Sequence, residues 1–164
     1  MTGWGKALLG LGFGSLVVSA IAPLVLHDRV VIEPIPKGMR AISAAPAFLA
    51  GVGSAYLPKD VARALVVPKG ARATSTSDGI GSYFERQVDY DISFPQAKVA
   101  AFFPAVLKQR GWHLLSTTSG RIDIVIATLG SSDGWTWEIG VRISPAKGGL
   151  TPFSVQIQQM QEPD

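Results

Sequence analysis

Hydrophobic residues are distributed unevenly along this chain. Residues 7–26 form a run of twenty positions without a charged side chain. A helix rises about 1.5 Å per residue, so such a run covers the roughly 30 Å hydrocarbon core of a bilayer. The pattern predicts a single N-terminal transmembrane anchor over residues 1–29, with the rest of the chain held at a membrane surface.

The same run has an alternative interpretation as a cleavable signal peptide, because Lys6, the apolar core and the small residues Ala20 and Ala22 imitate its three regions. Pro23 disfavours cleavage after Ala22, and the apolar run continues beyond it, which favours a retained anchor. Counting positive charges on the two sides of the span would leave the C-terminal part in the cytoplasm. The layout of a short tail, one span and a folded domain instead favours an extracytoplasmic, periplasmic domain.

Small residues recur within the predicted span. Gly10 and Gly14 are four residues apart, and Ser15 and Ser19 repeat this spacing. Small side chains at this interval let two membrane helices approach closely. We expect these four residues to pack against the helix of an integral membrane partner, the alternative being that glycine is simply common in membrane helices.

Residues 30–64 are rich in proline, alanine and glycine, and they predict an extended or irregular linker. Its centre, residues 41–57, is apolar but is interrupted by Pro46. An exposed apolar stretch generally marks an interaction site. We expect the linker to lie on a partner surface, a second membrane span being the alternative, and its expected contact residues are Phe48, Leu49, Tyr56 and Leu57.

From residue 65 onwards the pattern is that of a folded domain. Over residues 83–94, apolar side chains alternate with polar ones, which predicts a strand with one buried and one solvated face. Arg86 is the exception on the apolar face. Further strands are predicted over residues 65–68, 112–117, 122–126, 135–144 and 153–157.

A helix is predicted between the strands of residues 83–94 and 112–117. Ser93 and Gln96 have the spacing of a capping box, and Pro95 lies where a missing N–H costs nothing. Apolar residues then follow at helical spacing, Pro104 should kink the helix, and Gly111 should end it.

Together these elements predict an α+β fold for residues 65–164. It is an antiparallel sheet of about five or six strands with one helix packed on a face. The anchor (1–29), the linker (30–64) and this domain (65–164) complete the expected organisation.

Composition excludes several classes of function. The net charge is +3, but the fifteen Lys and Arg residues are scattered, which does not favour nucleic-acid binding. The chain has no cysteine, so disulfides, thiolate metal sites and thiol nucleophiles are excluded.

Catalytic and metal-binding signals are also lacking. The two histidines, His27 and His113, are far apart in sequence, and no serine lies in a Gly-x-Ser-x-Gly elbow. Glu85, Asp89 and Asp91 share one strand face, where a calcium site is an alternative to a solvated acidic face. We therefore expect no catalytic residue, no cofactor and no metal.

The segments VVPKGA, FPQAKVAAFFPAVLKQRGW, SDGWTWEIGVRIS and FSVQIQQ resemble small domains of actinobacterial envelope proteins with one N-terminal anchor. This resemblance covers residues 65–160. In size and layout the chain is also similar to the small association factors of the mycobacterial respiratory supercomplex of cytochrome bcc and aa3 oxidase. The resemblance implies a cell-membrane location and cytochrome bcc–aa3 subunits as partners.

The sequence thus predicts a non-catalytic, membrane-anchored accessory or assembly subunit of a larger membrane complex, with the respiratory supercomplex as the expected host. The alternative is an envelope protein whose α+β domain holds a lipid or cell-wall ligand between helix and sheet.

Overall fold

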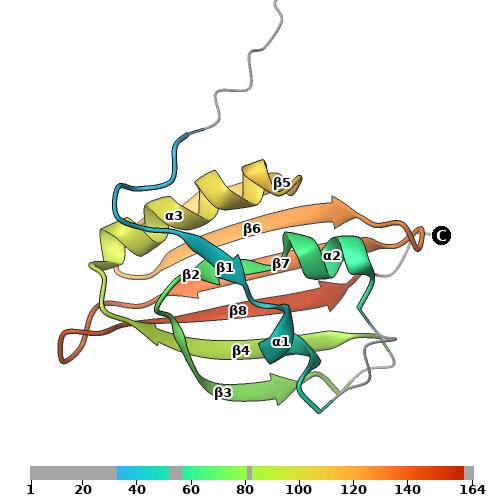
Figure 1. Cartoon of the computed structure of the whole chain (residues 1–164), viewed down its shortest axis with the longest axis horizontal. Helices are drawn as coiled ribbons and strands as arrows, with labels where there is room; N and C mark the ends of the chain where they lie inside the picture. The colour runs from blue at the N-terminus through green and yellow to red at the C-terminus, as the bar shows by residue number, and fades with distance from the viewer. Residues whose placement is uncertain (1–32, 52–56, 81–82, 161–164) are drawn as a thin grey trace, which may run out of the picture. The chain divides into compact units, whose positions relative to one another are not determined.

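Six antiparallel strands form one sheet in the order β3-β4-β8-β7-β6-β5 (Figure 1). The computed structural model describes residues 33–51, 57–80 and 83–160. The longest helix of this part, α3 (Gln96–Gln109), packs on one face of the sheet. The sheet strands are β3 (Arg72–Asp78), β4 (Glu85–Ile92), β5 (His113–Thr118), β6 (Asp123–Gly130), β7 (Thr136–Ile143) and β8 (Thr151–Gln159).

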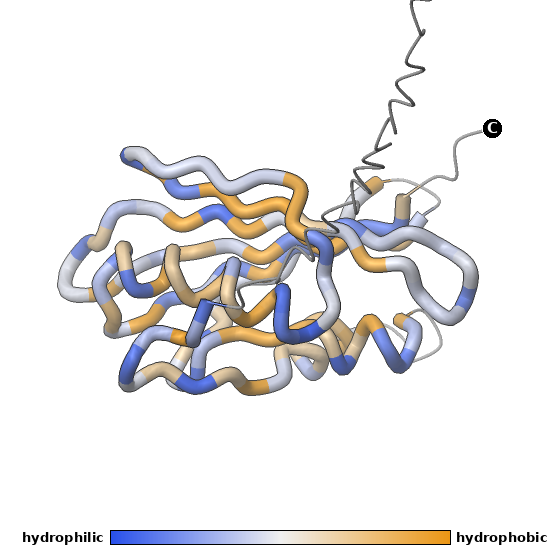
Figure 2. Tube along the Cα trace, turned by 90° about the horizontal axis from the view of Figure 1, so that it is seen from above, coloured by the Kyte–Doolittle hydropathy of each residue, from blue (hydrophilic) through white to orange (hydrophobic). Residues whose placement is uncertain are grey.

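Alternation along the strands separates a buried inner face from a solvated outer face. In β4, β7 and β8 every second residue is buried, and the register places these residues opposite one another, as Val88, Val155 and Val141 are. Figure 2 shows the same alternation of hydrophobic and hydrophilic positions along the strands. Because successive strand residues point to opposite faces, one sheet can pack its inner side while its outer side meets water.

The predicted α+β class with an antiparallel sheet is confirmed for the described residues, and the sheet has six strands. The strand predicted over residues 65–68 is present as Val66–Pro68, but it pairs outside this sheet. Strand β3 was not predicted. All seven of its residues are exposed and none is a large apolar residue, so it carries no hydrophobic alternation. It lies at the edge of the sheet, where one side of the strand has no neighbour to pack against.

Residues 33–51 and 57–68 form what we call the strap, which lies on the inner face of the sheet (Figure 1). Its elements are β1 (Ala41–Ser43), α1 (Ala45–Leu49), α2 (Lys59–Ala64) and β2 (Val66–Pro68). Strands β1 and β2 pair antiparallel, and the Ala44 N–H donates to the Leu65 carbonyl at 3.0 Å. The two halves of the strap therefore hydrogen-bond to each other, in addition to packing on the sheet.

The strap corrects the prediction of a linker on a partner surface. Phe48 is fully buried and Leu57 is 5% exposed, and both belong to the core of this domain. Leu49 is half-buried and packs against the same core, while Tyr56 lies outside the described residues. The folded unit therefore begins near residue 31 rather than at residue 65. The apolar side chains that were expected to contact a partner instead pack in the core on the inner face of the sheet.

The alternative of a second membrane span over residues 41–57 also finds no support. These residues begin as a three-residue strand and a five-residue helix. Among the described residues, no helix is both long and apolar enough to cross a bilayer. The predicted anchor over residues 1–29 lies outside the described part.

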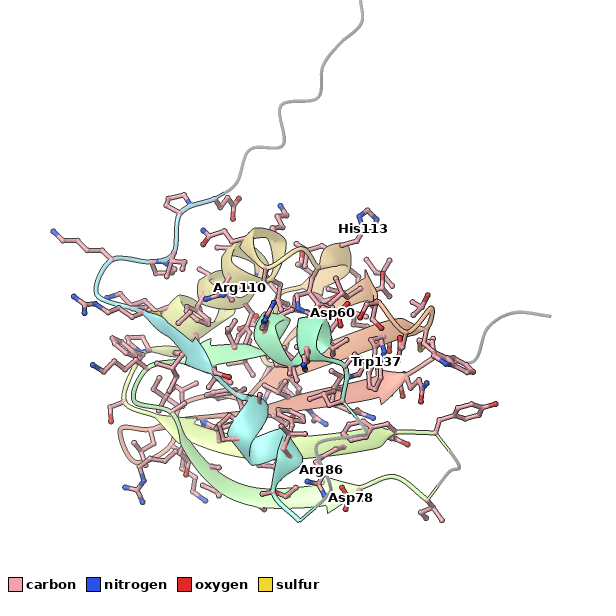
Figure 3. The ribbon with its side chains drawn as sticks, turned by 45° about the vertical axis from the view of Figure 1, so that its right-hand side comes forward. Asp60, Asp78, Arg86, Arg110, His113 and Trp137 are labelled. Carbon is pink, nitrogen blue, oxygen red and sulfur yellow. The ribbon has the colours of Figure 1, made fainter. Side chains whose placement is uncertain are left out.

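Arg86 is the charged residue on the inner face of β4, and it joins the strap to the sheet. Its side chain is 5% exposed, and its Nε and Nη2 donate to the Asp78 carboxylate at 2.5 and 2.9 Å. Its Nη1 donates to the carbonyls of Phe48 and Ala50 at 3.0 and 2.5 Å. Figure 3 shows Arg86 and Asp78 side by side at the end of α1. One guanidinium thus satisfies carbonyls at the C-terminal end of α1 and ties β3 to β4.

Helix α3 begins differently from the prediction. Pro95 is at its N-cap, and no side chain caps the helix, so the expected capping box between Ser93 and Gln96 is wrong. The Gln96 side chain instead reaches the β5–β6 turn. At the other end, Trp112 is buried and its indole N–H donates to the Ala64 carbonyl at 3.0 Å, which holds α2 beside α3.

We predict that the strap is needed for folding. A fragment of residues 31–164 should unfold cooperatively in urea, whereas one of residues 65–164 should aggregate because the inner face is uncovered. Within the longer fragment, Phe48→Ala should lower the free energy of unfolding by about 3–5 kcal/mol. Ile42→Ala, at a strap position that is 40% exposed, is the matched control and should change it little. Cooperative folding of residues 65–164 would contradict this account.

We also predict that the Arg86–Asp78 pair makes stability depend on pH. The hydrogen bonds that Arg86 donates hold the pKa of Asp78 below the ordinary carboxyl value, so the folded state favours the ionised form of Asp78. This contribution should be present above about pH 4 and lost as pH falls through the folded-state pKa. The stability difference between wild type and Asp78→Asn should therefore shrink between pH 7 and pH 2, measured by urea unfolding.

Arg86→Ala should cost more at neutral pH, about 2–4 kcal/mol, because it also leaves two strap carbonyls without their donor. Arg142→Ala, on the exposed outer face, is the matched control. A pH-independent difference between wild type and Asp78→Asn would show that ionisation of Asp78 adds nothing to stability.

Candidate functional site

A cleft of about 660 Å³ lies between the N-terminal half of α3 and the β5–β6 hairpin. It is open on one side. Its volume falls within the range of about 300–1,000 Å³ that small-molecule sites occupy. Its lining residues are Gln96, Ala97, Ala100, Ala101, Pro104, Thr117, Thr118, Ser119, Gly120, Asp123, Ile124 and Val125.

Beyond Gln96, the helix side of the cleft is smooth because α3 presents only small apolar side chains there. Ala97 and Ala101 are exposed, and they are four residues apart, so they share one face of the helix. Ala100 and Pro104 complete this side and are half-buried. Large apolar residues of α3, such as Phe102 and Phe103, face the core instead. The cleft is therefore the space that short side chains leave unfilled.

The hairpin side combines hydroxyl groups with branched apolar side chains. Thr117 and Thr118 end β5, and both are exposed. Val125 is buried opposite Thr117, and Ile124, paired with Thr118, is 38% exposed. Strand β5 is an edge strand, so no other strand of the described residues pairs with the hairpin on this side.

The cleft has a polar end at the β5–β6 turn. Asp123 is 8% exposed there, and its two carboxylate oxygens accept hydrogen bonds from the Gly120 N–H at 3.1 Å and the Gln96 amide at 2.9 Å. The Gln96 amide also donates to the Arg121 carbonyl at 3.2 Å. Gln96 thus fastens the first turn of α3 to the hairpin and defines this end.

The outer face of the sheet carries Glu85, Asp89 and Asp91, the acidic residues for which a calcium site is the alternative to a solvated face. Asp89 accepts hydrogen bonds from Ser75 at 2.5 Å and from Gln87 at 2.8 Å. Glu85 accepts one from Gln156 at 2.7 Å. Across the described ranges, no group of three acidic or histidine side chains has the arrangement of a metal site. The hydrogen bonds that these two carboxylates accept come from neutral side chains on the outer face.

His113 begins β5 and is exposed, and in Figure 3 it points away from the domain. Two other polar groups lie deep in the core. Trp137 is fully buried, and its indole N–H has no hydrogen-bond partner among the described residues. Burial raises the pKa of Tyr90 to about 12, and its hydroxyl likewise has no partner in the described part of the chain. Neither residue lines the cleft.

The predicted partner-contact residues therefore do not form a site within the described residues. Phe48 and Leu57 are buried, and Leu49 packs beside them. Gly10, Gly14, Ser15 and Ser19 lie outside the described part. The sequence does not identify the cleft residues as a site. Alanine and threonine are common residue types that indicate no particular chemistry, and only the fold brings α3 and the hairpin together.

Comparison with models of known families, with curated proteins and with solved structures gives no match for this chain.

Proposed function

We propose that this chain is a non-catalytic envelope protein, held at the membrane by residues 7–26, whose domain binds a lipid-like molecule between α3 and the β5–β6 hairpin. The observation that carries this proposal is the cleft itself. It has the volume of a small-molecule site, a smooth apolar side and a polar end. An elongated molecule with an apolar chain and a polar head matches that distribution.

The shape and lining favour an aliphatic chain over a sugar. The lining has no aromatic side chain on which a sugar ring would stack, and its helix side consists of Ala97, Ala100, Ala101 and Pro104. These small side chains allow close van der Waals contact along the helix. The stretch from Gln96 to Pro104 covers about 12 Å at 1.5 Å per residue, enough for a short length of chain.

A second candidate function is the accessory role in a membrane complex, with the respiratory supercomplex as host. The observation that favours it is the spacing of Gly10 and Gly14 in the predicted anchor. It ranks second because Phe48 and Leu57, expected to contact a partner, are part of the domain's own core. The two functions are compatible, since one uses the anchor and the other the domain.

We predict that filling the cleft removes the bound lipid. Ala101 is exposed on the cleft side of α3, so Ala101→Trp should occupy the space without disturbing the core. Gln109→Trp is the matched control, because Gln109 is exposed on the same helix but does not line the cleft. The tagged full chain would be purified from its native membrane in mild detergent and its lipid content measured by native mass spectrometry.

Wild type and Gln109→Trp should retain a lipid that Ala101→Trp loses. Equal lipid content in all three proteins, with unchanged near-UV circular dichroism, would argue against the cleft as the binding site.

We predict for the second candidate that Gly10→Leu together with Gly14→Leu separates the chain from its complex. The larger side chains would prevent close approach of a partner helix. Gly12→Leu, on the opposite side of the predicted helix, is the control. Heme absorbance and mass spectrometry of the same purification report on cytochrome partners. Cytochromes that remain with the double variant would count against this packing face.

A further inference from the structure

Asp123 is a buried carboxylate at the polar end of the cleft. It is 8% exposed, and it is one of the few buried charged residues in the described part of the chain. Both hydrogen bonds that it accepts come from neutral donors, the Gly120 N–H and the Gln96 amide. A carboxylate has about four lone-pair sites, so these two donors leave acceptor capacity unused.

No cation of the described residues pairs with Asp123. The one ion pair found there joins Arg86 to Asp78. Lys98, on the same helix as Gln96, donates to the Lys37 carbonyl at 3.1 Å and lies over the Phe94 ring. Arg121 has an exposed side chain and contributes only its carbonyl to the Gln96 bond. Asp123 thus differs from Arg86, whose charge is neutralised within the protein.

A buried charge without a counter-ion costs free energy, and an incoming cation would recover part of that cost. The cleft gives such a cation a way in, because Asp123 is among its lining residues. We propose that the cleft selects amphiphiles with an ammonium head group, which Asp123 binds while the apolar chain lies along α3. This inference rests on the proposed function and adds the charge of the ligand.

The arrangement of the lining fits this orientation. Asp123 and Gln96 lie at one end, and the small side chains of α3 continue away from them towards Pro104. An ammonium group near Asp123 would donate to the free carboxylate positions in charge-assisted hydrogen bonds. The threonine and serine hydroxyls of the hairpin can accept its remaining donors.

Three probes with the same chain and different heads test the inference: octylammonium, octanol and octanoate. The full chain, held in a nonionic amphipol, would be titrated with each by isothermal calorimetry, with empty amphipol as the blank. Wild type should bind octylammonium at least about tenfold more tightly than octanol, because its ammonium group can form a charge-assisted hydrogen bond with Asp123. Octanoate should bind more weakly than octanol because its charge would be repelled.

In Asp123→Asn the preference for octylammonium should disappear. Asp133→Asn is the matched control, since Asp133 also accepts a hydrogen bond from a backbone N–H in a turn but is exposed and does not line the cleft. The wild-type series keeps the test valid even where Asp123→Asn disturbs the hairpin.

Octanoate binding as tightly as octylammonium to wild type would overturn the inference. If Ala101→Trp abolishes the binding of all three probes while Asp123→Asn keeps their order, the cleft is a ligand site and Asp123 serves only the turn. If no probe binds wild type above the blank, the proposed function fails together with this inference.

Discussion

The buried guanidinium of Arg86 is the contact on which the arrangement of the domain depends. A charged group on the inner face of a sheet is unfavourable unless its donors are satisfied. Here the Asp78 carboxylate and the carbonyls of Phe48 and Ala50 satisfy them, so the charge fixes the edge strand β3 and the end of α1 in one place. Because Asp78 is 57% exposed on its side chain, the geometry of Arg86 and the strap carbonyls carries most of the constraint.

Helix α3 lies on a different part of the inner face. The strap covers the inner face on the β4 side, where α1 contacts β4, and α3 contacts β5, β6, β7 and β2. The strap and α3 thus form one layer that covers the inner face of the sheet. The first turns of α3 carry small side chains towards the hairpin, so the layer is incompletely filled there. The cleft results from packing an alanine-rich helix face against an edge hairpin, while the aromatic side of the same helix fills the core.

The charged side chains of the domain lie in two kinds of environment. On the outer face, carboxylates such as Glu85 and Asp89 meet amide and hydroxyl donors in contact with water. In the interior, Arg86 is neutralised by Asp78, whereas Asp123 has only neutral donors. That difference between two buried charges makes the cleft, rather than the outer face, the place where a charged ligand would gain most from binding.

The sequence by itself determined the α+β class and most sheet strands, because burial on one face imposes a period of two that can be read locally in β4, β7 and β8. It also identified Arg86 as the one charged residue on the apolar face of β4. Tertiary structure decided the rest. Whether Phe48 and Leu57 contact a partner or their own core depends on residues far away in the chain, and a polar edge strand such as β3 has no periodic signal. In β6 the isoleucines share one face, yet Val125 and Ala127 on the other face are the ones buried, because the position of α3 selects the inner side. The cleft could also be found only from the fold, because it is a space between α3 and the β5–β6 hairpin and no pattern in either segment encodes it.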